Sequence, residues 1–220
     1  KKRDYDVIQI YSFMNNASNA KLNLLNNELE IDGVAQIFLS DSQNVYLYPL
    51  EQKITLKKNR DFFFSGRVHA GRFDFYGKKF YFNYDKFNID MENIDSLALS
   101  VIRKEPSKNQ YEEQKLERVH SVIEHIKGEL LIDKPYNKSG SKNYAEYPVF
   151  ISHKDSYVFY DKPGIQKGVY TRNKFYFHLV PFTIDSLDNF DPSTLALKGT
   201  LTSSGIFPEF EEDMKVQPDY

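Results

Sequence analysis

The sequence contains no cysteine and no tryptophan, and only 10 of its 220 residues are glycine. The absence of cysteine excludes a disulfide scaffold, a cysteine-ligated zinc site and a thiol nucleophile. No apolar run reaches the roughly 18 residues that a membrane-spanning helix needs. The net charge is only −2, which argues against a nucleic-acid-binding protein, because such proteins usually carry a surplus of basic residues.

Most of the sequence alternates between apolar and polar residues with a period of two. Phe80 and Phe82 share one face of a predicted strand, and Tyr81 lies on the opposite face. Short runs of this kind are separated by clusters of Asn, Asp, Gly and Lys, which is typical of an all-β protein. We therefore predict antiparallel strands that form either a sandwich or an extended, curved sheet.

One segment departs from this period. Its apolar positions are spaced three, four and three residues apart, at Leu116, Val119, Ile123 and Ile126. This spacing favours an amphipathic helix near residues 110–127. A strand is the alternative, because alternate residues of the same segment are also apolar.

Three blocks of sequence recur in the same order, which indicates an internal duplication. The third block is the clearest, because residues 79–90 and 174–185 match at seven of twelve positions without a gap. We predict a first β-unit at 1–104, a connector at 105–127 and a second β-unit at 128–220. The chain begins without methionine and stops after an acidic segment, so we expect it to be a piece of a longer protein with further repeats.

No arrangement of residues predicts catalysis. His120 and His125 lie five residues apart, or about 140° around a helix, and do not form the i, i+4 pair that binds one metal ion. Gly66 and Gly71 have the spacing of a phosphate-binding loop, but Arg72 follows where that loop has lysine. We expect these glycines to form a bulge or a tight crossing in the sheet. We expect no catalytic residue, no metal site and no cofactor, and hence no enzyme.

The chain is rich in aromatic residues, with 18 phenylalanines and 16 tyrosines. An aromatic core accounts for the phenylalanines, because they alternate at inward positions. The tyrosines on the opposite faces are candidates for ligand binding, namely Tyr46, Tyr48, Tyr76 and Tyr81. An exposed row of tyrosines favours a sugar ligand, whereas a concave apolar groove across both units favours a lipid.

Several of these blocks resemble repeats of large, uncharacterised bacterial envelope proteins. The blocks are Glu-Leu-x-Ile-Asp, Lys-Phe-Tyr-Phe and the segment from Phe64 to Phe73. Short strands with an apolar-x-Gly-x-apolar pattern are also similar to AsmA/TamB-type proteins. This resemblance implies long curved sheets, a location in the periplasm or cell envelope, and a link to lipid transport. It covers about half of the chain and implies no catalytic residue.

Together these observations predict a non-enzymatic structural or interaction module of a larger exported or envelope-associated protein. Its predicted partners are the flanking repeats of the same protein. The alternative is a module that binds a glycan or a lipid through the aromatic faces of the sheet. We expect neither nucleic-acid binding nor a membrane-spanning segment.

Overall fold

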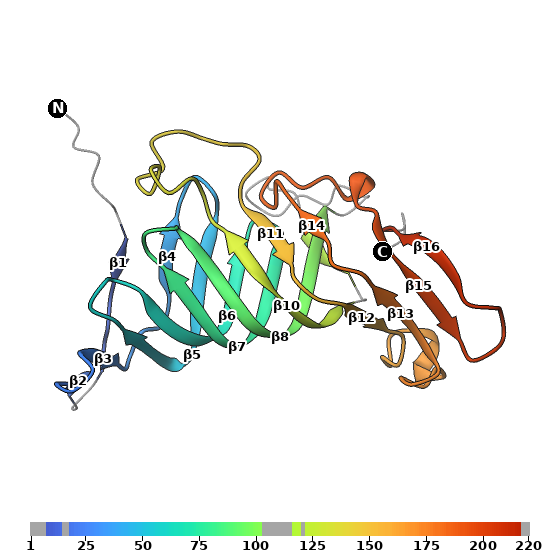
Figure 1. Ribbon diagram of the computed structural model, residues 1–220, viewed down its shortest axis with the longest axis horizontal. Helices are drawn as coiled ribbons and strands as arrows, with labels where there is room; N and C mark the ends of the chain where they lie inside the picture. The colour runs from blue at the N-terminus through green and yellow to red at the C-terminus, as the bar shows by residue number, and fades with distance from the viewer. Residues whose placement is uncertain (1–7, 15–17, 103–115, 120–121, 217–220) are drawn as a thin grey trace, which may run out of the picture.

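The computed structural model describes residues 8–14, 18–102, 116–119 and 122–216. These residues form sixteen β-strands and two short 3-10 helices, Gln166–Gly168 and Pro192–Thr194 (Figure 1). The predicted all-β fold is therefore confirmed. The strands are β1 (Gln9–Ile10), β2 (Ala20–Asn23), β3 (Glu28–Ile31), β4 (Ile37–Ser40), β5 (Val45–Leu56), β6 (Phe62–Ala70), β7 (Phe73–Asn83), β8 (Asn88–Ile102), β9 (Leu116–Arg118), β10 (Ile123–Leu131), β11 (Val149–Ser152), β12 (Ser156–Phe159), β13 (Phe175–Leu179), β14 (Thr183–Ile184), β15 (Leu197–Ser203) and β16 (Phe210–Met214).

The strands form one open antiparallel sheet that divides into two layers. The first layer follows the order β1-β4-β5-β6-β7-β8-β10-β12-β13-β15-β16. The second layer consists of β2 and β3, the other ends of the five long strands β5 to β8 and β10, and then β11 and β14. The five long strands belong to both layers because each of them bends. In Figure 1, β11 and β14 lie in front of β8 and β10.

Each layer carries a row of apolar residues in register, with one residue from every strand. The alternation of the sequence produces these rows, because side chains of paired residues point to the same face of a sheet. The first row is Ile10, Ile37, Leu47, Val68, Phe75, Leu97, Ile123, Val158, Phe177, Leu201 and Phe210. The second row is Leu22, Leu29, Leu56, Phe62, Phe82, Ile89, Leu130, Phe150 and Ile184.

The long strands bend along a line of register shifts. The pairing shifts between Pro49 and Ile54 on β5, and at Gly66 on β6 and Gly77 on β7. A further shift lies between Ile126 and Gly128 on β10. Irregularities of this kind increase the local bend of a strand. Since they fall on neighbouring strands, they fold the whole sheet along one line.

Two paired glycines permit the close approach of backbones at this bend. Gly66 has a φ of +138°, and a Cβ atom there would lie 2.3 Å from the carbonyl oxygen of Tyr48. A Cβ atom on Gly77 would lie 2.1 Å from the carbonyl oxygen of Asn93. The prediction of a bulge at Gly66 is confirmed, and Gly71 lies in the tight turn between β6 and β7.

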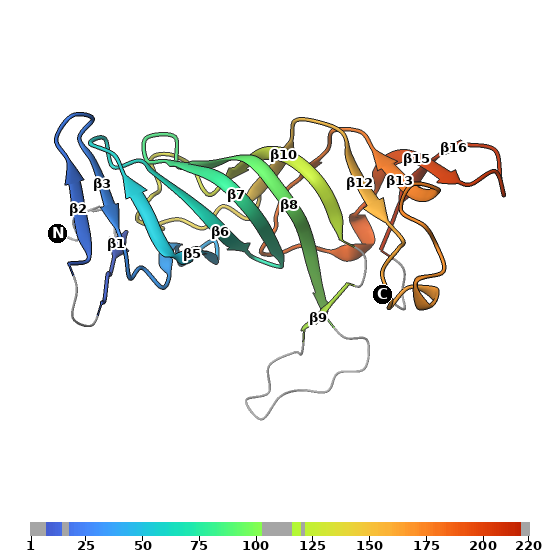
Figure 2. The same cartoon turned by 90° about the horizontal axis from the view of Figure 1, so that it is seen from below.

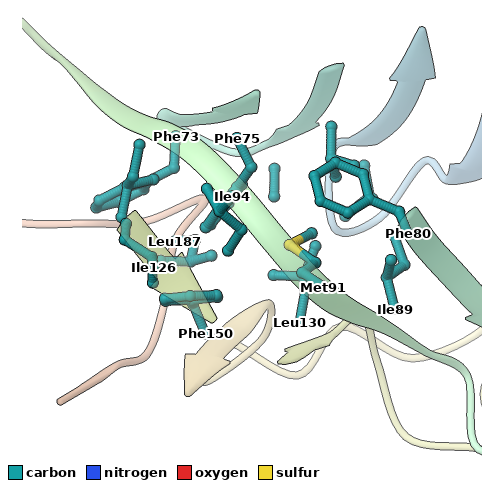
Figure 3. Packing of buried hydrophobic residues seen from close by; sticks show 14 of the residues in the cluster. Phe73, Phe75, Phe80, Ile89, Met91, Ile94, Ile126, Leu130, Phe150 and Leu187 are labelled. Atoms are coloured by element: carbon teal, nitrogen blue, oxygen red, sulfur yellow. The ribbon is translucent and has the colours of Figure 1, made fainter. Parts of the chain in front are cut away.

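The core lies between the two layers. Figure 3 shows Phe75 and Ile94 from the long strands beside Phe150 from β11 and the loop residue Leu187. The rings of Phe75 and Phe150 have centroids 4.8 Å apart. The same distance separates Phe73 from Phe190, which follows β14. All these side chains are at most 5% exposed, so these phenylalanines belong to the core, as predicted, whereas Phe13, Phe63, Phe207 and Phe210 are exposed.

The predicted helix near residues 110–127 is wrong where the structure describes this segment. Leu116–Arg118 is strand β9, and Ile123–Leu131 is strand β10, while residues 103–115 and 120–121 lie outside the described part. His125 lies between Ile123 and Ile126 and has a φ of +62°. Ile123 pairs with Leu97 and Ile126 with Ile94, and both isoleucines are buried in the core. The helix-like spacing of three residues therefore belongs to an irregular strand.

The predicted duplication and its boundaries stay predictions. Residue 128 lies inside β10, so this strand continues across the proposed start of the second unit. The first copy of the third block forms a hairpin, in which the end of β7 pairs with the start of β8. In the second copy, β13 pairs with β12 and β15, while β14 pairs with β11. The two copies thus differ in how their strands pair.

Candidate functional site

An apolar cavity lies on the inner face of the first layer, beyond the area that the second layer covers. Its volume is about 380 Å³. Its walls come from β7, β8, β10, β12, β13, β14, β15, β16 and the residues around them. Six of the residues that line it are consecutive members of the first apolar row, namely Leu97, Ile123, Val158, Phe177, Leu201 and Phe210.

The cavity exists because the second layer is shorter than the first. Among the described residues, the second layer ends at β14, whereas the first continues through β12, β13, β15 and β16. Phe150 and Phe190 therefore fill the space over Phe75 and Phe73, but the inner face further along the sheet lacks a covering strand in the described part. Leu195, Met214 and Val216 border the cavity there and are partly buried.

The cavity wall is apolar, and charged residues gather at one edge. Phe210 is 42% exposed and marks the opening. The charged lining residues are Glu212, Asp213 and Lys215, which follow Phe210 along the chain. Tyr160 is the tyrosine of the lining, and burial raises the pKa of its hydroxyl. An apolar interior with charges at the mouth suits a ligand with an apolar tail and a polar head.

The structure brings three of the four candidate tyrosines together. Tyr46 and Tyr48 on β5 and Tyr76 on β7 lie on the outer face of the first layer, where Tyr48 and Tyr76 flank Arg67 in one row. The guanidinium of Arg67 lies 4.0 Å from the ring centroid of Tyr48, and that of Arg118 lies 5.3 Å from the centroid of Tyr76. Tyr48 and Tyr76 therefore stack with arginines and do not form a bare platform for a sugar.

Tyr81 lies on the far side of the bend, apart from the other three. Its hydroxyl donates a hydrogen bond to Asp61, which raises the pKa of this tyrosine, and burial adds to the effect. Its ring packs against Phe63 with centroids 4.7 Å apart. Tyr81 thus has a structural partner of its own.

A second outer-face cluster was not predicted from the sequence. Tyr157 and Phe159 on β12 stack with centroids 5.7 Å apart, and Tyr176 and His178 on β13 lie against Tyr157. Each of these residues alternates with an apolar one, which is a signal for an outer face. Alternation assigns the faces of one strand but does not show which strands are neighbours. In the structure, β12 pairs with both β10 and β13.

Glu124 anchors an ionic network beside this cluster. Lys162 donates a hydrogen bond of 2.7 Å to its carboxylate, and Arg172 donates another. Arg172 also stacks on Phe159 and pairs with Asp161. Burial on its own would raise the pKa of Glu124, but the hydrogen bonds and charges of Lys162 and Arg172 outweigh it, and the pKa is lowered.

The lowered pKa of Glu124 predicts a loss of stability in acid. A pKa that is lower in the folded than in the unfolded state stabilises the fold above the unfolded value and ceases to do so as the pH falls through the folded value. We expect Glu124→Gln to lower the free energy of unfolding by about 1 kcal/mol at neutral pH, since both cations are partly exposed. The deficit should shrink in urea unfolding curves recorded in acid, as the pH falls through the folded pKa. A deficit of equal size at neutral and acid pH, or an equal effect of the exposed control Glu51→Gln, would contradict this assignment.

The described residues contain no cluster that predicts catalysis or metal binding. No group of three or more His, Cys, Asp and Glu residues in the described part is arranged to hold a metal ion. The pKa of Asp90 is raised by burial and by the neighbouring carboxylate of Glu129. This pair lies on the outer face and away from the cavity, because Asp90 pairs with Glu129 and Tyr81 while Ile89 and Met91 face the core.

Comparisons with known proteins identify no relative. No protein-family model matches the chain, and none of the curated proteins or solved structures searched is significantly similar to it. In particular, no enzyme family was found. Within the described residues, no helix is long and apolar enough to span a membrane.

Proposed function

We propose that this chain is a non-enzymatic binding module whose cavity holds the acyl chain of a lipid. The observation that carries the proposal is the unfilled part of the first apolar row, where side chains of six strands line a space of about 380 Å³. This volume lies within the range of about 300–1,000 Å³ for small-molecule sites. Each methylene group that enters such a site contributes about 0.8 kcal/mol.

The charges at the mouth favour a lipid with a neutral or zwitterionic head. Glu212, which shares the inner face of β16 with Phe210 and Met214, places a carboxylate there. A free fatty acid would bring a second carboxylate to this edge, where like charges repel. A zwitterionic head offers both signs of charge, so a single-chain lipid such as lysophosphatidylcholine is the best matched probe.

The other parts of the proposal have different support. The resemblance to envelope repeats supports a location in the cell envelope and contacts with flanking repeats of the same protein. The glycan alternative has less support, because Arg67 and Arg118 lie over the rings of Tyr48 and Tyr76. Most residues that line the cavity belong to the second predicted unit, and Phe73, Leu97 and Leu99 line it from the first.

The test places a larger side chain in the cavity by substituting one of the residues that line it. Leu201 points into it from β15, whereas Thr202, the next residue, points to the outer face. We expect Leu201→Trp to weaken the binding of lysophosphatidylcholine at least about tenfold, which is about 1.4 kcal/mol, and the matched variant Thr202→Trp to bind as the wild type does. Calorimetric titration below the micellar concentration measures both. Met214→Trp, on the neighbouring strand β16, serves if Leu201→Trp does not fold.

Two results would overturn the proposal. One is a wild-type chain that binds no lysophosphatidylcholine. The other is equal binding by the wild type and both cavity variants, which would place the lipid elsewhere on the surface.

A further inference from the structure

Among the described residues, strand β16 lies at an edge of the sheet, where β15 is its single partner. It pairs with β15 in an unbroken register from Leu197↔Met214 to Leu201↔Phe210. Among the described residues, β1, β2, β9 and β14 are the other strands with a single partner, and β16, with five residues, is longer than each of them. Figure 2 shows β15 and β16 at one end of the molecule, opposite β2 and β3. A bulge or a proline would hinder further pairing at such an edge, and β16 contains neither.

The inner face of β16 leaves the first apolar row unfinished. Phe210 is the last member of this row and is 42% exposed, whereas Phe177 and Val158 in the same row are at most 4% exposed. Ile206 and Phe207, in the turn before β16, are also exposed. A further strand with an apolar residue beside Phe210 would bury this ring as its neighbours are buried.

The outer face of β16 carries charge of one sign. Glu211 and Asp213 point to this side, opposite Thr200 and Lys198 of β15. Two β16 strands side by side would bring these carboxylates together, and like charges directly opposite are destabilising. This repulsion disfavours the pairing of two β16 strands with each other. On the other side of β16, Asp213 lies opposite Lys198 of β15, which indicates that these carboxylates favour a basic residue on a paired strand.

We propose that β16 binds an extended segment of another polypeptide in which basic and apolar residues alternate. The apolar residues would continue the first row beside Phe210 and Met214, and the Lys or Arg side chains would lie beside Glu211 and Asp213. The main chain of the segment would form hydrogen bonds with backbone N–H and C=O groups along the edge of β16, as in other cases of β-strand addition. This inference does not depend on whether the cavity binds a lipid.

The test is an NMR titration of the chain with an acetylated, amidated peptide of alternating lysine and valine. We expect amide shift changes concentrated in β16 and β15. Methylating alternate peptide nitrogens on the pairing side removes hydrogen-bond donors but keeps the charge, and should weaken binding at least about tenfold. The double variant Glu211→Lys/Asp213→Lys should reverse the preference, so that a glutamate–valine peptide binds and the lysine–valine peptide does not.

Three outcomes would overturn the proposal. The first is the absence of shift changes at β16. The second is equal binding of the methylated peptide, which would mean that charge alone attracts it. The third is an unchanged peptide preference in the folded double variant, which would place the peptide on another acidic surface.

Discussion

Replacing Gly66 by alanine is expected to lower the free energy of unfolding by at least about 3 kcal/mol. With a φ of +138°, Gly66 has a backbone conformation that residues with a side chain rarely adopt, and the added methyl group would lie 2.3 Å from the carbonyl oxygen of Tyr48. A carbonyl of a paired strand cannot move aside without breaking the ladder. The bend between the layers would therefore be strained or lost.

The matched control for this prediction is Gly205→Ala. Gly205 also has a positive φ, of +79°, but nothing lies within 4 Å of the position of a Cβ atom there. We expect Gly205→Ala to lower the free energy of unfolding only by the cost of the left-handed backbone conformation for alanine, which is about 1–2 kcal/mol. Urea unfolding of both variants measures the difference. Equal effects would mean that the bend does not depend on close contact at Gly66.

Replacing Phe150 by alanine is expected to cost about 3–5 kcal/mol. Phe150 is fully buried, and its ring joins the second layer to Phe75 of the first. The substitution removes the ring and leaves a cavity between two layers that the bent strands hold at a fixed distance. Phe207→Ala, at an exposed ring, is the control and should change stability by less than about 0.5 kcal/mol.

A double-mutant cycle that combines Phe150→Ala with Phe75→Ala separates the interaction between the two rings from the loss of apolar burial at each position. Aromatic pairs of this kind are coupled by about 0.5–1.5 kcal/mol. A coupling near zero, measured from urea unfolding of the single and double variants, would show that the two layers do not pack through these rings.

The sequence predicted the strands well because alternation is a local property. The burial of Phe80 and Phe82 and the partial exposure of Tyr81 agree with the predicted faces. The prediction failed at residues 123–126, where a strand with a positive φ at His125 has apolar residues at the spacing of a helix. The spacing of apolar residues alone does not distinguish this irregular strand from a helical turn.

The candidate site could be predicted only in part. The tyrosines were assigned to outer faces from local alternation, and the structure brings together Tyr46, Tyr48 and Tyr76 on one such face. The cavity was not localised, because Leu97 and Phe177 have the same alternation as Ile89 and Phe82. Whether an apolar residue is covered depends on where the second layer ends, and that is decided by the distant strands β11 and β14.

Native mass spectrometry of the purified chain, followed by organic extraction, shows directly whether the cavity holds a lipid. We expect a stoichiometric adduct of one single-chain lipid after incubation with lysophosphatidylcholine, present in Thr202→Trp and absent in Leu201→Trp. A bare chain mass in the wild type, or the same adduct in all three proteins, would contradict it.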